Sequence, residues 1–163
     1  MRESEKVKVH VEIGDARADF EGDVDQVFEL AARFLTQICP SLKVLRRLIY
    51  TPDITKLAEK IGGLIEISPE GPIMLFSFDV PTRDAVCLIL LGAYLGKVLG
   101  ILGKDSISSR DLARIIGKAR KTVSNEMPRL VSEGVVERTS EGEYRLTILG
   151  IKKTEKIIER YKK

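Results

Sequence analysis

The start of the chain shows two apolar periodicities, one typical of strands and the other of a helix. Residues 7–13 alternate Val or Ile with polar side chains, and residues 16–20 alternate again after a Gly-Asp turn. This alternation predicts a half-buried β-hairpin. Over residues 24–38 apolar side chains recur every three or four positions, and Asp23 is placed to cap a helix. We therefore expect a β-β-α unit whose helix packs on one face of the hairpin.

The middle of the chain predicts shorter elements. A short helix is expected over residues 42–50. A second is expected over residues 51–60, because it opens with a Thr-Pro pair in which Thr is the N-cap and Pro the first helical residue. Two strands are expected over residues 64–67 and 73–76, joined by a Ser-Pro-Glu-Gly turn.

A long apolar segment follows and opens with Pro81 and Thr82. Residues 85–102 approach the length of a membrane-spanning helix, but they contain Lys97 and are followed by Gly103. A buried helix in a water-soluble domain is the better interpretation, so no membrane partner is expected.

The glycines of this segment predict a close approach by another segment. Gly92, Gly96 and Gly100 lie at four-residue intervals. Each glycine inside a helix costs about 1 kcal/mol relative to alanine, which is best explained by a neighbour packed tightly on that face. The neighbour belongs either to the same chain or to a second copy across a dimer interface, and the sequence leaves both alternatives open.

The chain is expected to divide near residues 79–81. The first domain, residues 1–80, is expected to be α+β and to serve oligomerisation or partner binding. The second, residues 81–163, begins with the long apolar helix and contains the most informative pattern of the chain.

That pattern is two short helices joined by a tight turn. The first helix is capped by Ser108 or Ser109 and ends at Gly117, where a left-handed backbone conformation is commonly needed. The second begins near Ala119 or Arg120, and Pro128 is expected to remove one of its hydrogen bonds and kink it. The expected inner faces are Leu112, Ala113 and Ile116 in the first helix and Val123, Met127 and Leu130 in the second. This spacing predicts a helix-turn-helix.

A hairpin and a last helix complete the pattern. Gly134 ends the second helix, residues 135–139 and 143–146 read as two strands around a Ser-Glu-Gly turn, and Thr147 caps the last helix. The apolar positions of that helix are Ile151, Ile157, Ile158 and Tyr161.

These residues resemble winged helix-turn-helix transcription regulators of the MarR-like kind over roughly residues 83–161. The matching positions are Leu112-Ala113, Gly117, Thr122-Val123-Ser124, Leu130, Gly134-Val135-Val136 and Tyr144-Arg145-Leu146-Thr147 with Gly150. The resemblance implies a homodimer that binds double-stranded DNA, with the hairpin as its wing. Residues 1–80 do not match the dimerising helices that usually flank such regulators; their opening is similar to those of small archaeal proteins.

Charge supports a nucleic-acid partner. The whole chain carries +3, but residues 104–163 hold 15 basic and 9 acidic residues, a net +6, against 12 and 15, a net −3, in residues 1–103. Charged residues make up 31% of the chain, while Asn125 is its one Asn, which is a composition typical of a thermophilic source.

The direction of each side chain on the second helix follows from the 100° step per residue. With Val123 pointing inward, Lys118, Lys121 and Asn125 point outward. Basic side chains are expected to contact phosphates, and Asn125 can bond an adenine edge. The expected DNA-binding residues are Lys118, Arg120, Lys121, Thr122, Ser124, Asn125, Arg129, and on the wing Arg138 and Arg145.

Three other functions compete with DNA binding. A winged helix can instead be a protein-interaction module in a larger assembly, which the wing residues Glu137, Glu141 and Glu143 favour. Single-stranded nucleic-acid binding by residues 1–80 is disfavoured, because that segment has few aromatic residues and a negative charge. Enzymatic function is disfavoured as well.

The reactive residue types argue against catalysis. His10 is the one histidine, and the acidic residues between 15 and 25 lack metal-ligand spacing. Cys39 and Cys87 lie in apolar patterns without a neighbouring ligand, as expected for reduced core thiols in a cytoplasmic protein. No metal or cofactor is therefore expected.

Overall fold

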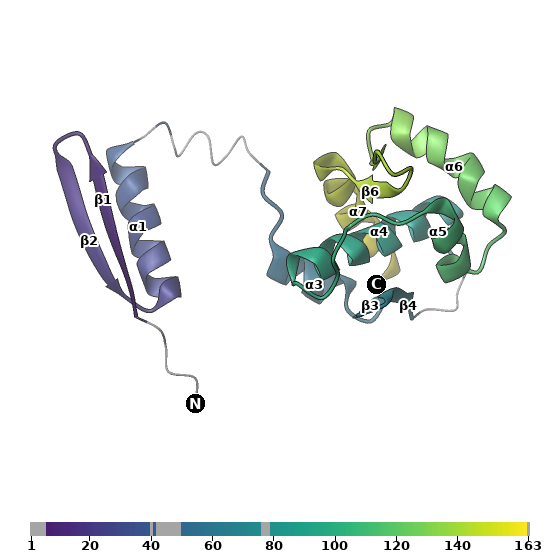
Figure 1. The fold of residues 1–163 in the computed structure, drawn as a ribbon, viewed down its shortest axis with the longest axis horizontal. Helices are drawn as coiled ribbons and strands as arrows, with labels where there is room; N and C mark the ends of the chain where they lie inside the picture. Colours follow the sequence, from purple (N-terminus) through teal and green to yellow (C-terminus); the bar gives the residue numbers. More distant parts are fainter. Residues whose placement is uncertain (1–5, 40, 42–49, 76–78, 163) are drawn as a thin grey trace. The chain divides into compact units, whose positions relative to one another are not determined.

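The chain forms two compact units, Met1–Thr51 and Pro52–Lys163, in a computed structural model that describes residues 6–39, 41, 50–75 and 79–162. The described residues form six helices and three two-stranded antiparallel sheets, an α+β architecture (Figure 1). We call these units the amino-terminal unit and the carboxy-terminal unit and describe each by itself.

The amino-terminal unit has the β-β-α order that the sequence predicts. Strands β1 (Val7–Ile13) and β2 (Ala16–Gly22) pair antiparallel through a two-residue turn. Gly14, the first turn residue, has a φ of 58°, which suits the hairpin turn that requires glycine at this position. Helix α1 (Val24–Ile38) starts where the Asp23 carboxylate accepts a hydrogen bond from a first-turn backbone N–H.

Packing in this unit is shallow. Val27 is its one buried residue among those described, and the inward side chains of both strands are half-buried. The rings of Phe20 on β2 and Phe34 on α1 meet edge to face with their centres 5.7 Å apart. The helix is thus held to the hairpin by a single thin apolar layer.

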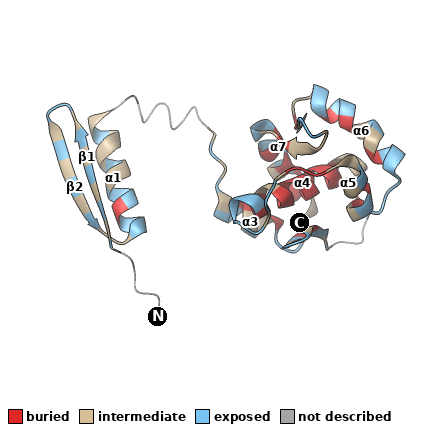
Figure 2. Cartoon of the chain, viewed as in Figure 1, coloured by how far each residue is buried: buried red, intermediate tan, exposed pale blue. Residues whose placement is uncertain are grey.

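The carboxy-terminal unit begins with α3 (Ile54–Ile61), followed by the hairpin of β3 (Ile65–Ser68) and β4 (Gly71–Met74). Helix α4 (Thr82–Val98) comes next and is the centre of the unit. Twelve of its residues are buried, and Figure 2 shows this helix as the most continuously buried element. Within the described residues, no helix is long and apolar enough to cross a membrane.

Two expectations about the start of this unit need correction. The N-cap of α3 is Asp53 rather than Thr51, because the Asp53 carboxylate accepts a hydrogen bond from the N–H of Lys56 at 3.1 Å. The second strand of the hairpin starts at Gly71, earlier than expected. The helix predicted over residues 42–50 lies almost wholly outside the described residues.

The expected domain boundary near Pro81 does not coincide with the division between the units, which falls after Thr51. The physical reason is packing. A Cβ atom placed on Gly92 would lie 2.8 Å from Ile65 and 3.0 Å from Pro72, so the β3-β4 hairpin presses directly on α4. Residues 52–75 therefore share one core with the rest of the carboxy-terminal unit.

The same contacts explain the spaced glycines. Gly92 faces the β3-β4 hairpin, and Gly96 faces Leu102 and Ile67, where an added Cβ would lie 2.6 Å and 3.0 Å away. Gly100 lies beyond the end of α4 with a φ of 74°, a left-handed conformation that turns the chain. Of the two alternatives, packing within the chain accounts for Gly92 and Gly96.

The remaining elements follow α4 closely. They are α5 (Ser109–Ile116), α6 (Arg120–Ser132), the hairpin of β5 (Val136–Arg138) and β6 (Tyr144–Leu146), and α7 (Ile148–Tyr161). Helix α7 packs against α4, where the Tyr161 hydroxyl donates a hydrogen bond to Asp84 at 2.8 Å. Burial and this bond raise the pKa of Tyr161 to about 12.

Candidate nucleic-acid interface

Helices α5 and α6 are joined as the sequence predicts. The Ser108 hydroxyl caps α5 by accepting a hydrogen bond from the N–H of Asp111 at 3.1 Å. Gly117 ends α5 with a φ of 71°, and Lys118 N–H donates to the carbonyl of Ala113 at 3.1 Å. The inner positions of both helices are buried as expected: Leu112, Ala113, Ile116, Val123, Met127 and Leu130.

Lys118 does not belong to the outward face of α6. It lies in the turn before the helix, because Ala119 is the N-cap and Arg120 the first helical residue. Its Nζ is 3.5 Å from a carboxylate oxygen of Asp79, so its charge is partly balanced within the chain. The helical projection used for Lys118 was therefore wrong.

The outward face of α6 is polar and open. Lys121, Thr122 and Asn125 are exposed, and Ser124 is half-buried. The helix continues through Pro128, although this residue has no N–H to donate. Arg129 is exposed too, but its Nε is 3.1 Å from a carboxylate oxygen of Glu133.

Glu133 also fixes the end of α6 to the start of α4. Its carboxylate receives two hydrogen bonds from the Arg83 guanidinium, one of them at 2.9 Å. The Arg83 hydrogen bonds lower the pKa of Glu133 to about 2. Arg129 on α6 adds to the same effect. The orientation of α6 thus depends on this fork-shaped ion pair.

The pair gives stability an expected acid dependence. Because the pKa of Glu133 is lower in the folded chain than its usual 4.5, its contribution is complete above that value and is lost as pH falls toward 2. Between pH 4.5 and about pH 2, the urea midpoint of unfolding is expected to fall less steeply in Glu133→Gln than in the wild type. Urea unfolding at a series of pH values measures this, with Glu126→Gln as control; equal pH profiles for Glu133→Gln and the wild type would contradict it.

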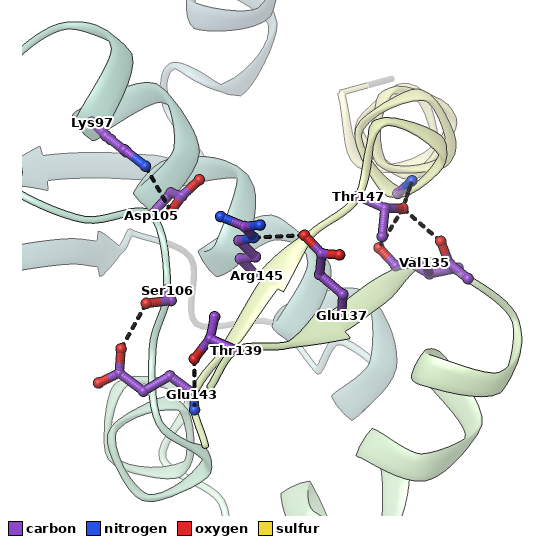
Figure 3. Close-up of polar contacts among 11 residues, drawn as sticks. Lys97, Asp105, Ser106, Val135, Glu137, Thr139, Glu143, Arg145 and Thr147 are labelled. Atoms are coloured by element: carbon purple, nitrogen blue, oxygen red, sulfur yellow. Dashed lines mark hydrogen bonds and ion pairs between the residues drawn. The ribbon is translucent and has the colours of Figure 1, made fainter. Parts of the chain in front are cut away.

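The β5-β6 hairpin is tied to the body of the unit by polar contacts (Figure 3). Glu143 accepts hydrogen bonds from Lys104 and from Ser106, both at 2.6 Å, and they lower its pKa. Arg145 is bound to Glu137 across the hairpin at 2.6 Å. Two of the three carboxylates on this hairpin are therefore compensated by basic groups of the same chain, and so is Arg145.

Four arginines line one groove on this surface. Arg110 and Arg114 come from α5, Arg120 from the start of α6, and Arg138 from β5; the groove has a volume of about 770 Å³. Its one carboxylate is Asp111, which lies 3.2 Å from Arg114. Sequence reasoning selected Arg120 and Arg138 but missed Arg110 and Arg114. Their four-residue spacing on α5 was the available signal.

The ion pairs divide the basic residues of this surface into two sets. Arg114, Lys118, Arg129 and Arg145 each have a carboxylate within 4 Å, as described above. Among the described residues, no carboxylate lies within that distance of the side chains that we call the unpaired set: Arg110, Arg120, Lys121 and Arg138. The second set keeps its full charge available for an external anion.

The residue types considered for catalysis lie elsewhere. Burial raises the pKa of the Cys87 thiol to about 12, so it is uncharged at neutral pH. Cys39 is half-buried at the end of α1. His10 is exposed on β1 and donates from Nδ1 to Asp19 at 2.8 Å, a bond that raises its pKa. The described residues contain no cluster of three His, Cys, Asp or Glu side chains that could hold a metal.

Comparison of the chain with models of known protein families, with curated proteins and with solved structures gave no match in any of the three.

Proposed function

We propose that the carboxy-terminal unit binds double-stranded DNA as a winged helix-turn-helix, with α5 and α6 as the helix pair and β5-β6 as the wing. The observation that carries the proposal is the groove that brings together arginines of α5, α6 and the wing. DNA presents regularly spaced phosphates, and arginine binds phosphate through two parallel hydrogen bonds. A surface built from three elements of this motif suits that polyanion.

The start of α6 adds to the attraction for phosphate. No side chain caps this helix, because Ala119 is its N-cap, so first-turn N–H groups are left for another acceptor. The positive end of the helix dipole lies at the same place, beside Arg120. A DNA phosphate could therefore meet backbone and guanidinium donors together.

In this proposal α6 enters the major groove and its outward face reads base edges. Lys121 and Thr122 lie in the first turn, and Asn125 follows one turn later on the same exposed face. Asn can bond adenine through two hydrogen bonds, and lysine can bond guanine. Two copies of the chain would place two such helices about one DNA turn, or ~34 Å, apart on a palindromic site. A transcription regulator is the role that fits this arrangement.

The test is the salt dependence of duplex binding. Arg110→Ala/Arg120→Ala removes two of the unpaired set, so the slope of log K against log salt is expected to become shallower by roughly 1.8, or about 0.9 per phosphate contact. Arg145→Ala is the matched control, because this arginine is already bound to Glu137. Its slope is expected to change by less than about half a unit. Fluorescence anisotropy with a labelled duplex between roughly 50 and 200 mM salt provides the measurement.

Two results would contradict the proposal. One is absence of duplex binding at the lowest salt, and the other is an unchanged slope in the double variant. Either would move the protein-interaction alternative into first place. That alternative rests on the acidic wing, yet Glu137 and Glu143 are both bound to basic groups of the same chain. The remaining wing carboxylate, Glu141, is the place to look for such a partner's contact.

A further inference from the structure

The amino-terminal unit exposes more apolar surface than so small a unit usually can. Phe28 on α1 is 73% exposed and Val24 is 57% exposed. The unit spans Met1–Thr51, close to the size of about 40 residues below which folded units usually need a disulfide, a metal or an oligomeric partner. Both cysteines of the chain are free. An oligomeric partner that covers the exposed apolar side chains of α1 is the remaining way to stabilise the unit.

The hairpin also has a free edge that can accept a strand. A two-residue turn makes Ile13 and Ala16 a hydrogen-bonded pair, so the bonded pairs of this hairpin alternate from there. The backbone N–H and C=O groups of Lys8, His10 and Glu12 consequently point away from β2. Unpaired strand edges of this kind readily pair with another strand.

The sequence of β1 is complementary to itself when reversed about His10. An antiparallel copy centred there would place Lys8 opposite the partner's Glu12, Val9 opposite the partner's Val11, and Val7 opposite the partner's Ile13. Sliding one strand by two residues would place Lys8 or Glu12 opposite the partner's His10 and lose both Lys8–Glu12 pairs. A slide of four residues would place two Lys8 or two Glu12 side chains opposite each other, which is unfavourable. The same pairing through β2 would place Arg17 opposite the partner's Glu21 but oppose two Asp19 carboxylates, whereas pairing through β1 opposes two His10 side chains. Charge therefore favours the register of β1 that is centred on His10, and the two opposed Asp19 carboxylates count against pairing through β2.

The exposed apolar side chains lie on the matching flank of α1. Val27 and Phe34 are the helix residues that approach β2, through Gly22 and Phe20 respectively. At 100° per residue, Val24 and Phe28 lie some 60–120° round the helix from them. They therefore face the β1 side, above the edge where a second strand would pair.

We propose that a second copy of this chain pairs its β1 with β1 in antiparallel register about His10. The result is a four-stranded sheet in the order β2-β1-β1-β2 with both α1 helices on one face. The two-fold axis is perpendicular to the sheet, so Val24 and Phe28 of each α1 face the α1 of the partner. The proposal concerns self-association and does not depend on DNA binding by the carboxy-terminal unit.

Charge reversal on β1 tests the register. Lys8→Glu places two pairs of like charges in the dimer, and so does Glu12→Lys, so each is expected to weaken dimerisation about tenfold or more. The double variant restores opposite charges at both pairs and is expected to recover affinity to within about threefold of wild type. Sedimentation velocity of the full chain over a concentration series measures the dissociation constants.

If only contacts within one chain mattered, the double variant would be disturbed more than either single variant. The order of the dissociation constants therefore distinguishes the two explanations. Lys8 is 3.8 Å from Glu21 and Glu12 is 2.9 Å from Arg17, so the double variant disturbs two pairs in the hairpin and each single variant one. A double variant that dimerises worse than the single ones would overturn the proposal. A wild-type chain that stays monomeric at about 100 μM would overturn it as well.

A second variant tests the α1 contact. Phe28→Glu introduces a charge on an exposed side chain and is expected to weaken dimerisation at least about tenfold without unfolding the unit. The control is Ile73→Glu on β4, another exposed apolar residue, at 46% exposure, that lies in the carboxy-terminal unit. Equal dissociation constants for Phe28→Glu and wild type would remove α1 from the interface and refute the proposed arrangement.

Discussion

Gly150→Ala is expected to destabilise the carboxy-terminal unit by about 2–3 kcal/mol. Alanine would normally improve a helix, by about 1 kcal/mol. Here an added Cβ would overlap the carbonyl oxygen of Val135 and lie 2.9 Å from Leu146. The Val135 carbonyl is backbone and already accepts a hydrogen bond from the N–H of Thr147, so it cannot move aside without breaking the start of α7 away from β5.

The loss is measured by urea unfolding followed by tyrosine fluorescence, since Tyr94, Tyr144 and Tyr161 all belong to this unit. Gly103→Ala is the matched control, because a Cβ there would meet no atom within 4 Å. The control is expected to change the free energy of unfolding by less than about 0.5 kcal/mol. Similar midpoints for both variants would show that α7 and β5 can separate at little cost.

Leu130→Ala is expected to cost about 2–5 kcal/mol, because Leu130 is 0% exposed and its loss leaves a cavity beneath α6. The side chain closes the inner face of α6 together with Val123 and Met127. Once this contact is lost, Val123, Met127 and the ion pair of Glu133 with Arg83 remain to hold the helix.

The adjacent residue provides the control for this substitution. Val131 is 39% exposed, and Val131→Ala is expected to cost less than about 1 kcal/mol. Unfolding midpoints in urea, compared at constant slope, give both values. A small loss for Leu130→Ala would mean that α6 repacks freely, and a fixed recognition helix would then be untenable.

Local signals in the sequence predicted most helix ends correctly. Asp23, Ser108 and Thr147 each cap the helix that was expected to follow them. Gly117 adopts the left-handed conformation expected at the end of α5. These features depend on a few neighbouring residues, which is why a single sequence is enough to find them. The Thr51 N-cap failed because Asp53, two residues later, is the stronger competitor.

Tertiary packing is what the sequence could not supply. The boundary near Pro81 followed from a change of pattern, whereas the true division depends on Ile65 and Pro72 pressing on Gly92. The hydrophobic periodicity of neither segment indicates that contact. The spaced glycines indicated that something packs closely there, but only the fold identifies the β3-β4 hairpin as the neighbour.

The candidate site shows the same difference between features set by local sequence and features set by tertiary packing. Its outward-facing residues, such as Lys121 and Asn125, followed from the helical step, and they are exposed. The pairing of Arg145 with Glu137 depends on strand register, and the grouping of Arg110 with Arg138 depends on how α5 meets the hairpin. Which charges remain available to a ligand is therefore a property of the folded chain.

Arg83 and Asp84 are consecutive residues of α4, yet one binds the end of α6 and the other binds Tyr161 at the end of α7. Helices α6 and α7 are therefore both bound to neighbouring residues of α4, whose Cα atoms are about 3.8 Å apart. A rotation of α6 relative to α7 would break the ion pair of Arg83 with Glu133, so under the proposed function the carboxy-terminal unit would meet a DNA duplex as a rigid body. The DNA would then have to deform to fit the protein. Sites whose base steps bend easily would therefore be favoured, even at positions that no side chain touches.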